Sequence, residues 1–217
     1  MSSRILTLVL LLGLGNSALV FMSQMGALHL PGNQQGYEPP QPIAFSHRLH
    51  AGEMQVSCLY CHYGAEKSRN AGIPAASVCM NCHQFVTASL GALRAEDELA
   101  KKEGRRPRRI VSPELQKLYD ALALDGNLAR DPAKALTPIA WNRVHTLPDF
   151  AYFDHRPHLN AGVSCQQCHG PVETMEQVRQ EQNLTMGWCV NCHRDANRTG
   201  VAERKVNASL DCQVCHH

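Results

Sequence analysis

The sequence is poor in the side chains from which a large protein core is usually built. Of its 217 residues only 6% are aromatic, and the formal net charge is only +2. A chain of this length could form one globular domain or two small ones, but it has little apolar bulk for a core. The formal charge is not diagnostic by itself, and nothing in the sequence supports a nucleic-acid partner, so we expect none.

The sequence also lacks a cysteine outside one repeated pattern. All ten cysteines fall in C-x-x-C pairs, and a histidine directly follows each of the five pairs. A disulfide framework would not require that histidine. Zinc ribbons would bring such motifs together in pairs on one metal, which an odd number does not favour, and a thioredoxin-type dithiol needs a single exposed pair.

The C-x-x-C-H unit is typical of covalent haem attachment. Its two thiols form thioethers with the two vinyl groups of one haem, and the adjacent histidine binds the iron from one side. We therefore predict five haem c groups, which would supply the missing apolar bulk. The predicted thioether cysteines are Cys58, Cys61, Cys79, Cys82, Cys165, Cys168, Cys189, Cys192, Cys212 and Cys215. The predicted proximal iron ligands are His62, His83, His169, His193 and His216.

A second histidine pattern precedes two of these motifs. The pattern F-x-H-x-x-H occupies residues 45–50 and again residues 153–158, so the chain contains a duplication. A low-spin haem iron needs a second axial ligand, and a neutral imidazole from an upstream histidine is the usual protein group. Two imidazoles one helical turn apart can serve two different haems. The predicted distal ligands are His47, His50, His155 and His158.

The fifth distal ligand is open between two candidates. His145 lies ten residues before His155 and is the first candidate, with a supporting role such as a hydrogen bond to a propionate as its alternative. Met186, three residues before Cys189, is the second candidate, although a methionine is more often a packing residue. Thioether ligation would raise the potential of that haem. We expect the terminal His217 to be structural.

The N-terminal region has a long uncharged segment. Residues 5–28 carry no charge and could cross a bilayer as one helix, with Arg4 on one side and the rest of the chain on the other. A cleaved secretory signal is the alternative, but no convincing A-x-A cleavage site follows. We therefore expect a transmembrane anchor over residues 1–28 in the bacterial inner membrane, with the haem-bearing part in the periplasm, where c-type haem is attached.

Composition divides the remainder of the chain into four segments. The segments are an extended linker over 29–44, a dihaem module over 45–84, a helical connector over 85–148 and a trihaem module over 149–217. Within the connector, a helix is predicted over residues 86–103. A second helix is expected to begin with Ser112 as N-cap before Pro113 and to end at Asp125 and Gly126. The expected fold class is a mostly irregular and α-helical multihaem cytochrome c.

The duplicated F-x-H-x-x-H and the small loops between attachment motifs resemble the class III cytochromes c. In that group the first histidine of the pair serves the nearest haem and the second serves another. The resemblance implies two class III-like modules with the following assignments. His47 would serve the haem on Cys58 and Cys61, His50 that on Cys79 and Cys82, His155 that on Cys165 and Cys168, and His158 that on Cys189 and Cys192.

Longer strings, such as WNRVHTLPDFAYFDHRPH and LTMGWCVNCHR, are similar to the pentahaem, membrane-anchored cytochrome c subunits of alternative complex III. The resemblance covers nearly the whole chain outside residues 85–138. It implies a respiratory complex that oxidises quinol and passes electrons to a periplasmic cytochrome or a terminal oxidase. The implied partners are an iron-sulfur subunit, polytopic quinol-binding subunits and a monohaem cytochrome.

The ligand supply favours an electron carrier over an enzyme. With at least five candidate distal ligands for five irons, no iron need be open to a substrate. One alternative is a self-sufficient membrane-anchored quinol dehydrogenase or a reductase with an open haem. Another is an assembly subunit whose haems are only structural. The uncharged N-terminal segment supplies few polar groups for a quinol site, so we expect an electron-carrier subunit.

Overall fold

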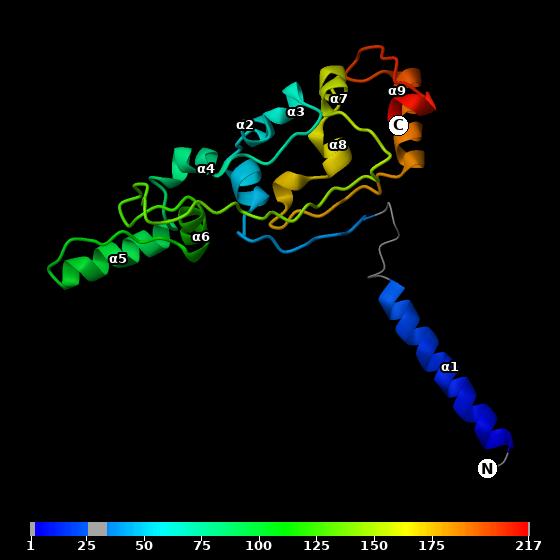
Figure 1. Cartoon of the computed structure of the whole chain (residues 1–217), viewed down its shortest axis with the longest axis horizontal. Helices are drawn as coiled ribbons and strands as arrows, with labels where there is room; N and C mark the ends of the chain where they lie inside the picture. Colours follow the sequence, from blue (N-terminus) through cyan, green and yellow to red (C-terminus); the bar gives the residue numbers. More distant parts are fainter. Residues whose placement is uncertain (1–2, 26–33, 217) are drawn as a thin grey trace.

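A computed structural model describes residues 3–25 and 34–216 (Figure 1). The described residues leave out 1–2 and 26–28 of the predicted anchor, 29–33 of the predicted linker, and the terminal His217. Within the described residues, the regular elements are helices, and β pairing is confined to isolated bridges. The prediction of a mostly helical and irregular fold is confirmed.

The first helix, α1 (Ser3–Met25), covers most of the predicted anchor. Its large apolar side chains, among them Leu8, Leu14 and Phe21, are exposed. A membrane span needs about 20 consecutive apolar residues. No helix among the described residues is both long enough and apolar enough to meet that requirement, so the predicted transmembrane helix is not supported.

Residues 34–44 of the predicted linker form no helix and are hydrogen-bonded to later parts of the chain. The backbone N–H of Gly36 donates to the carbonyl of Gln180 at 2.7 Å, and the N–H of Gln180 donates to the carbonyl of Tyr37 at 3.0 Å. Further along, the side-chain amide of Gln41 donates to the Asn142 carbonyl at 3.0 Å and accepts from the Asn142 N–H at 2.9 Å. The linker therefore lies along the connector and the trihaem module.

The dihaem module contains four short elements. They are η1 (Arg48–Glu53), α2 (Cys58–Cys61), α3 (Gly64–Lys67) and α4 (Ala76–His83). The element η1 is a single wide turn of π-helix, closed by a hydrogen bond from the Met54 N–H to the Leu49 carbonyl at 3.0 Å. Such wide turns occur frequently at functional sites.

The predicted trihaem module packs against the predicted dihaem module. Its elements are α7 (His155–Ala161), α8 (Cys165–His169), η2 (Val172–Thr174), α9 (Met186–Thr199) and α10 (Cys212–Cys215). The element η1 packs on η2, and α3 packs on α7. A Cβ added at Gly52 would lie 2.2 Å from the Glu173 carbonyl oxygen, so the close approach of η1 to η2 requires glycine.

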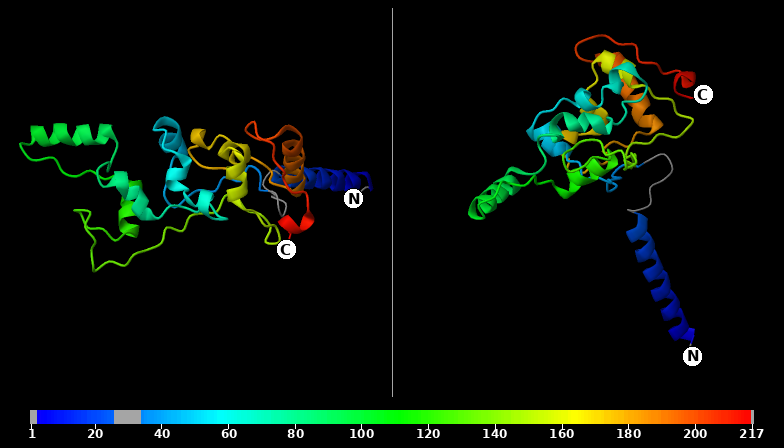
Figure 2. Two further views of the ribbon diagram at one scale, coloured as in Figure 1. Left: turned by 90° about the horizontal axis from the view of Figure 1, so that it is seen from above. Right: turned by 60° about the vertical axis from the view of Figure 1, so that its left-hand side comes forward.

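The connector contains α5 (Leu90–Lys102) and α6 (Pro113–Ala121). The predicted start of α6 is confirmed, because the Ser112 hydroxyl accepts a hydrogen bond from the Leu115 N–H and Pro113 occupies the first turn. The helix ends earlier than predicted, since Ala123 adopts a left-handed φ of 52° that a helix cannot accommodate. The other connector helix, α5, begins later than the predicted residue 86, with Ser89 as its N-cap. It projects from the rest of the chain as an arm (Figure 2).

The polypeptide by itself buries little apolar material. The described core residues are mostly small or isolated, namely Ala65, Ala88, Ala100, Leu118, Tyr119, Ala123, Val144 and Met175. The chain exposes 15484 Å² of surface, whereas a compact globular protein of this mass would expose about 10,000 Å². A small protein core is what the low aromatic content predicts.

Candidate haem-binding sites

Each attachment motif lies on a short helix or at the end of one. In a helical turn a first cysteine, a second three residues later and a histidine four residues later share one face, as in α4, α8 and α9, whereas His62 and His216 directly follow α2 and α10. All ten cysteines are free thiols. The motifs occupy α2, the end of α4, α8, the first half of α9, and α10. Each therefore presents two thiols and one imidazole together, as thioether attachment of a haem requires.

Three upstream histidines face three of the attachment histidines. The ring centroids are 6.1 Å apart for His50 and His83 and 6.0 Å apart for His158 and His193. His155 and His169 are 6.3 Å apart with their ring planes only 4° from parallel. Metal–imidazole bonds are about 2.0 Å long, so two imidazoles on opposite sides of one metal ion have ring centroids about 6 Å apart. The three pairs fit this spacing.

The fourth upstream histidine lies beside the first attachment motif. Burial, followed by the neighbouring rings of His62 and His50, lowers the pKa of His47 to about 4. The ring of His47 is therefore neutral near pH 7 and available as a ligand. Its Nδ1 atom is buried without a hydrogen-bond partner, which distinguishes His47 from the other upstream histidines.

Backbone carbonyls orient most of these imidazoles. A carbonyl can only accept a hydrogen bond, so the Nδ1 atom that contacts it carries the proton and Nε2 keeps its lone pair for a metal. The Nδ1–carbonyl distances are 2.8 Å for His50 to Ser46, 2.7 Å for His62 to Gly72, 2.8 Å for His83 to Val86, 2.9 Å for His155 to Arg69, 2.8 Å for His158 to Asp154 and 2.6 Å for His193 to Ser209. Imidazoles with a free Nε2 atom can bind the iron of haem c, and pairs of free thiols can attach its porphyrin, so these residues fit haem c.

The phenylalanine of each F-x-H-x-x-H pattern packs between its two histidines. The Phe45 ring stacks on His50 with centroids 4.3 Å apart and meets His47 edge-on at 4.9 Å. The Phe153 ring lies 4.7 Å from His158 and meets His155 edge-on at 4.8 Å. The phenylalanine thus sets the angle between the two imidazoles in both modules.

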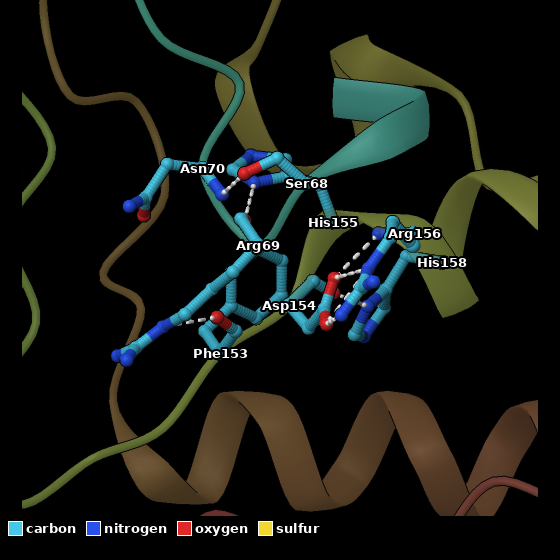
Figure 3. A network of polar contacts seen from close by, with 8 residues as sticks. All are labelled: Ser68, Arg69, Asn70, Phe153, Asp154, His155, Arg156 and His158. Atoms are coloured by element: carbon cyan, nitrogen blue, oxygen red, sulfur yellow. Dashed lines mark hydrogen bonds and ion pairs between the residues drawn. The ribbon is translucent and has the colours of Figure 1, made fainter. Parts of the chain in front are cut away.

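Arg69 links the dihaem module to His155 of the trihaem module (Figure 3). Its carbonyl accepts hydrogen bonds from both the backbone N–H and the Nδ1–H of His155, at 3.3 and 2.9 Å. Its guanidinium donates to the Phe153 carbonyl at 3.1 Å and lies 4.3 Å from the centre of the Tyr152 ring. Sequence reasoning missed Arg69, because a loop residue that acts through its carbonyl leaves no sequence signal.

Asp154 holds the start of α7 in the same network (Figure 3). Its carboxylate caps the helix by accepting from the Arg156 N–H at 2.9 Å, and it pairs with the Arg156 guanidinium at 2.6 Å. The hydrogen bond from the Arg156 side chain is the main reason that the pKa of Asp154 is lowered to about 2. The Asp154 carbonyl accepts from His158, so one residue caps α7 and orients a predicted ligand.

The structure places His145 against another histidine. The His145 Nε2 atom lies 3.2 Å from the Nδ1 atom of His169, and the two rings are nearly perpendicular with centroids 4.4 Å apart. Burial lowers the pKa of both rings to about 4, with the His145 ring as the next cause for His169. The Nε2 atom of His145 therefore lies at an attachment histidine, and the distal role of His145 stays a prediction.

The fifth attachment motif meets the start of the trihaem module. The Tyr152 N–H donates to the Cys215 carbonyl at 2.8 Å, and the Phe150 ring stacks on His216 with centroids 5.8 Å apart. Met186 is the first residue of α9 and is 69% exposed. Its role as a distal ligand stays a prediction.

The connector contacts the second attachment motif, residues 79–83, through a buried tyrosine. The Tyr119 side chain on α6 is only 2% exposed, and its hydroxyl donates to the His83 carbonyl at 2.5 Å. On the other side of α4, the Asn81 amide donates to the exposed Tyr60 hydroxyl at 2.8 Å. Residues 85–148 therefore help to fix α4, a role that their lack of cysteine did not suggest.

Thiols of different motifs influence one another. Burial comes first among the causes that raise the pKa of five cysteines, and a thiol of another motif is a further cause in each case. These influences link Cys61 with Cys82, Cys79 with Cys61, Cys165 with Cys58, Cys168 with Cys192, and Cys189 with Cys215. The helices of the motifs follow the order α4, α2, α8 and α9 across the molecule (Figure 1).

Comparisons with known proteins agree with this geometry. Residues 151–217 match the family described as cytochrome c7 and related cytochrome c. Over 196 residues the chain is 24% identical to the menaquinone reductase multihaem cytochrome c subunit of Nitratidesulfovibrio vulgaris strain Hildenborough. The aligned region covers 81% of this chain and 76% of that protein. Residues 151–217 are therefore similar to cytochrome c7, and most of the chain is similar to a multihaem cytochrome c subunit, which supports haem c as the cofactor.

Proposed function

We propose that this chain is an electron-transfer subunit with five haem c groups. The observation that carries the proposal is the set of three imidazole pairs at 6.0 to 6.3 Å between ring centroids. Each pair joins a histidine of an F-x-H-x-x-H pattern to the histidine of an attachment motif. When bound, haem c supplies a one-electron iron couple.

The side chains of this protein would act as attachment points and axial ligands. The ten thiols would hold the porphyrins, and the proposed axial pairs are His47 with His62, His50 with His83, His155 with His169, and His158 with His193. The Nδ1–H bonds to carbonyls make the imidazoles more basic, which stabilises the oxidised iron. For His216 we keep Met186 as the proposed distal partner.

The pKa influences between thiols of different motifs support a single file of sites. The proposed order is the motif of residues 79–83, then 58–62, 165–169, 189–193 and 212–216. The junction between Cys58 and Cys165 crosses from one module to the other. In such an arrangement the two end motifs are the points at which redox partners exchange electrons with this subunit.

The proposed partners are subunits of a quinone-linked respiratory complex. The relative from Nitratidesulfovibrio vulgaris is named a subunit of a menaquinone reductase, which supports a quinone-linked complex. We propose, more specifically, the quinol-oxidising alternative complex III, with an iron-sulfur subunit, polytopic quinol-binding subunits and a monohaem cytochrome as neighbours. The proposed location is the periplasmic side of a bacterial inner membrane, and the chain itself is a carrier.

A second candidate function is electron transfer in the opposite direction. The name of the same relative describes reduction of menaquinone, so electrons in that complex flow toward the quinone. Reduction of the isolated native complex by a quinol analogue, compared with its oxidation by a quinone, distinguishes the two directions. Faster haem reduction by quinol favours the first candidate, and faster haem oxidation by quinone favours the second.

The number of covalent haems tests the proposal directly. The full chain, purified from its native membrane, is expected to retain five haems after denaturation, measured by intact mass and by haem absorbance per polypeptide. Replacing both Cys212 and Cys215 by alanine should lower the count by one and leave the other four attached. A denatured chain without covalent haem would refute the proposal.

A further inference from the structure

The contact between His145 and His169 differs from the contacts of the other attachment histidines. His62, His83 and His193 each donate from Nδ1 to a backbone carbonyl. His169 instead has an imidazole side chain at its Nδ1 atom, at 3.2 Å. Because the partner is a side chain, the residue at position 145 can change the hydrogen bond of this ligand without a change in the backbone.

The direction of the hydrogen bond follows from the proposed role of His169. If its Nε2 atom binds iron, the Nδ1 atom must carry the ring proton and can only donate. The Nε2 atom of His145 is then the acceptor, and the His145 proton lies on its own Nδ1 atom. The two rings meet edge to face, 84° from parallel, so the N–H at the edge of one ring approaches the nitrogen end of the other.

The same contact argues against iron ligation by His145. Two imidazoles across one iron have centroids about 6 Å apart, whereas the centroids of His145 and His169 are 4.4 Å apart. His155 already faces His169 at 6.3 Å with nearly parallel rings. The His145 Nε2 atom lies 3.2 Å from the Nδ1 atom of His169, which places His145 beside that ligand and not in an axial position of the same haem.

We propose that His145 is a positioning residue that orients His169 and lowers the midpoint potential of the haem attached at Cys165 and Cys168. This inference rests on the proposed function. Val144, the residue before His145, is buried. An acceptor at Nδ1–H makes an imidazole ligand more basic and favours the oxidised iron. Removal of the acceptor therefore raises one potential only.

Two variants of the full haem-loaded protein test the proposal. His145→Phe keeps an aromatic ring but cannot accept a hydrogen bond, whereas His145→Gln retains an acceptor. For His145→Phe we expect five covalent haems, one midpoint potential shifted upward, four unchanged, and a change in one low-spin electron paramagnetic resonance signal. For His145→Gln the shift should be smaller, and neither variant should bind carbon monoxide.

The outcomes separate this inference from the proposed function. A high-spin haem that binds carbon monoxide in the Gln variant would show that His145 is an axial ligand and would overturn the inference. Unchanged potentials in both variants would show that His145 only packs, and would also overturn it. Either result leaves the count of five covalent haems intact, so the proposed function would stand. Should the Phe variant not fold, the Gln variant alone still decides between ligation and positioning.

Discussion

The buried hydrogen bond from Tyr119 to His83 allows a sharp test of the connector. Tyr119→Phe removes one hydroxyl and leaves the His83 carbonyl without that donor in a site where the tyrosine is 2% exposed. Loss of a buried hydrogen bond costs about 1 to 3 kcal/mol. For a chain of this size each 1 kcal/mol corresponds to roughly 2 to 4 °C in Tm.

Tyr60→Phe provides a matched control. The Tyr60 hydroxyl also contacts α4, through Asn81, but the Tyr60 side chain is 49% exposed. Water can replace that hydrogen bond, so the expected loss is below about 0.5 kcal/mol. Thermal unfolding followed by helical circular dichroism measures both variants in the haem-loaded protein. Equal shifts for the two variants, or an unchanged Tm for Tyr119→Phe, would refute the role assigned to α6.

Three further perturbations test the modules and the arm. Gly52→Ala should lower the free energy of unfolding by about 1 to 3 kcal/mol, because the new Cβ collides with the Glu173 carbonyl. The loss should appear as a lower Tm, and an unchanged Tm would contradict this. His158→Phe should leave five covalent haems but create one high-spin haem that binds carbon monoxide, and five low-spin haems would exclude its axial role. Hydrogen bonds from Arg105 and then Arg108 lower the pKa of Glu96 from 4.5 to about 2, so its stabilisation of the arm is present above pH 4.5 and lost as the pH falls toward 2. Proteolysis of the arm should therefore differ between wild type and Glu96→Gln near neutral pH and converge in acid; a constant difference would refute this.

The modules show how a duplicated sequence pattern makes a duplicated geometry. In both, a phenylalanine contacts two histidines that lie one turn apart, and each second histidine of the pair faces an attachment motif other than the nearest one. The pairs are His50 with His83 and His158 with His193. The second histidine of each F-x-H-x-x-H pattern therefore lies close to an attachment motif that follows further along the chain.

The sequence by itself determined the attachment motifs, the upstream histidines and the helix start at Ser112. These are local features, because a thiol pair with its histidine, or a hydroxyl three residues before the N–H that it caps, is defined within one helical turn. The apolar N-terminal segment was also visible, and α1 forms there, although no described helix meets the requirements of a membrane span.

Only the tertiary structure decided which groups support the ligands. Arg69 reaches His155 from 86 residues away, Tyr119 reaches His83 from 36, and His145 reaches His169 from 24. Several of these contacts use backbone carbonyls, which every residue type carries, so no sequence pattern marks them. The order of the five motifs likewise follows from the packing of α3 on α7 and η1 on η2, which brings Cys58 to Cys165 across the two modules.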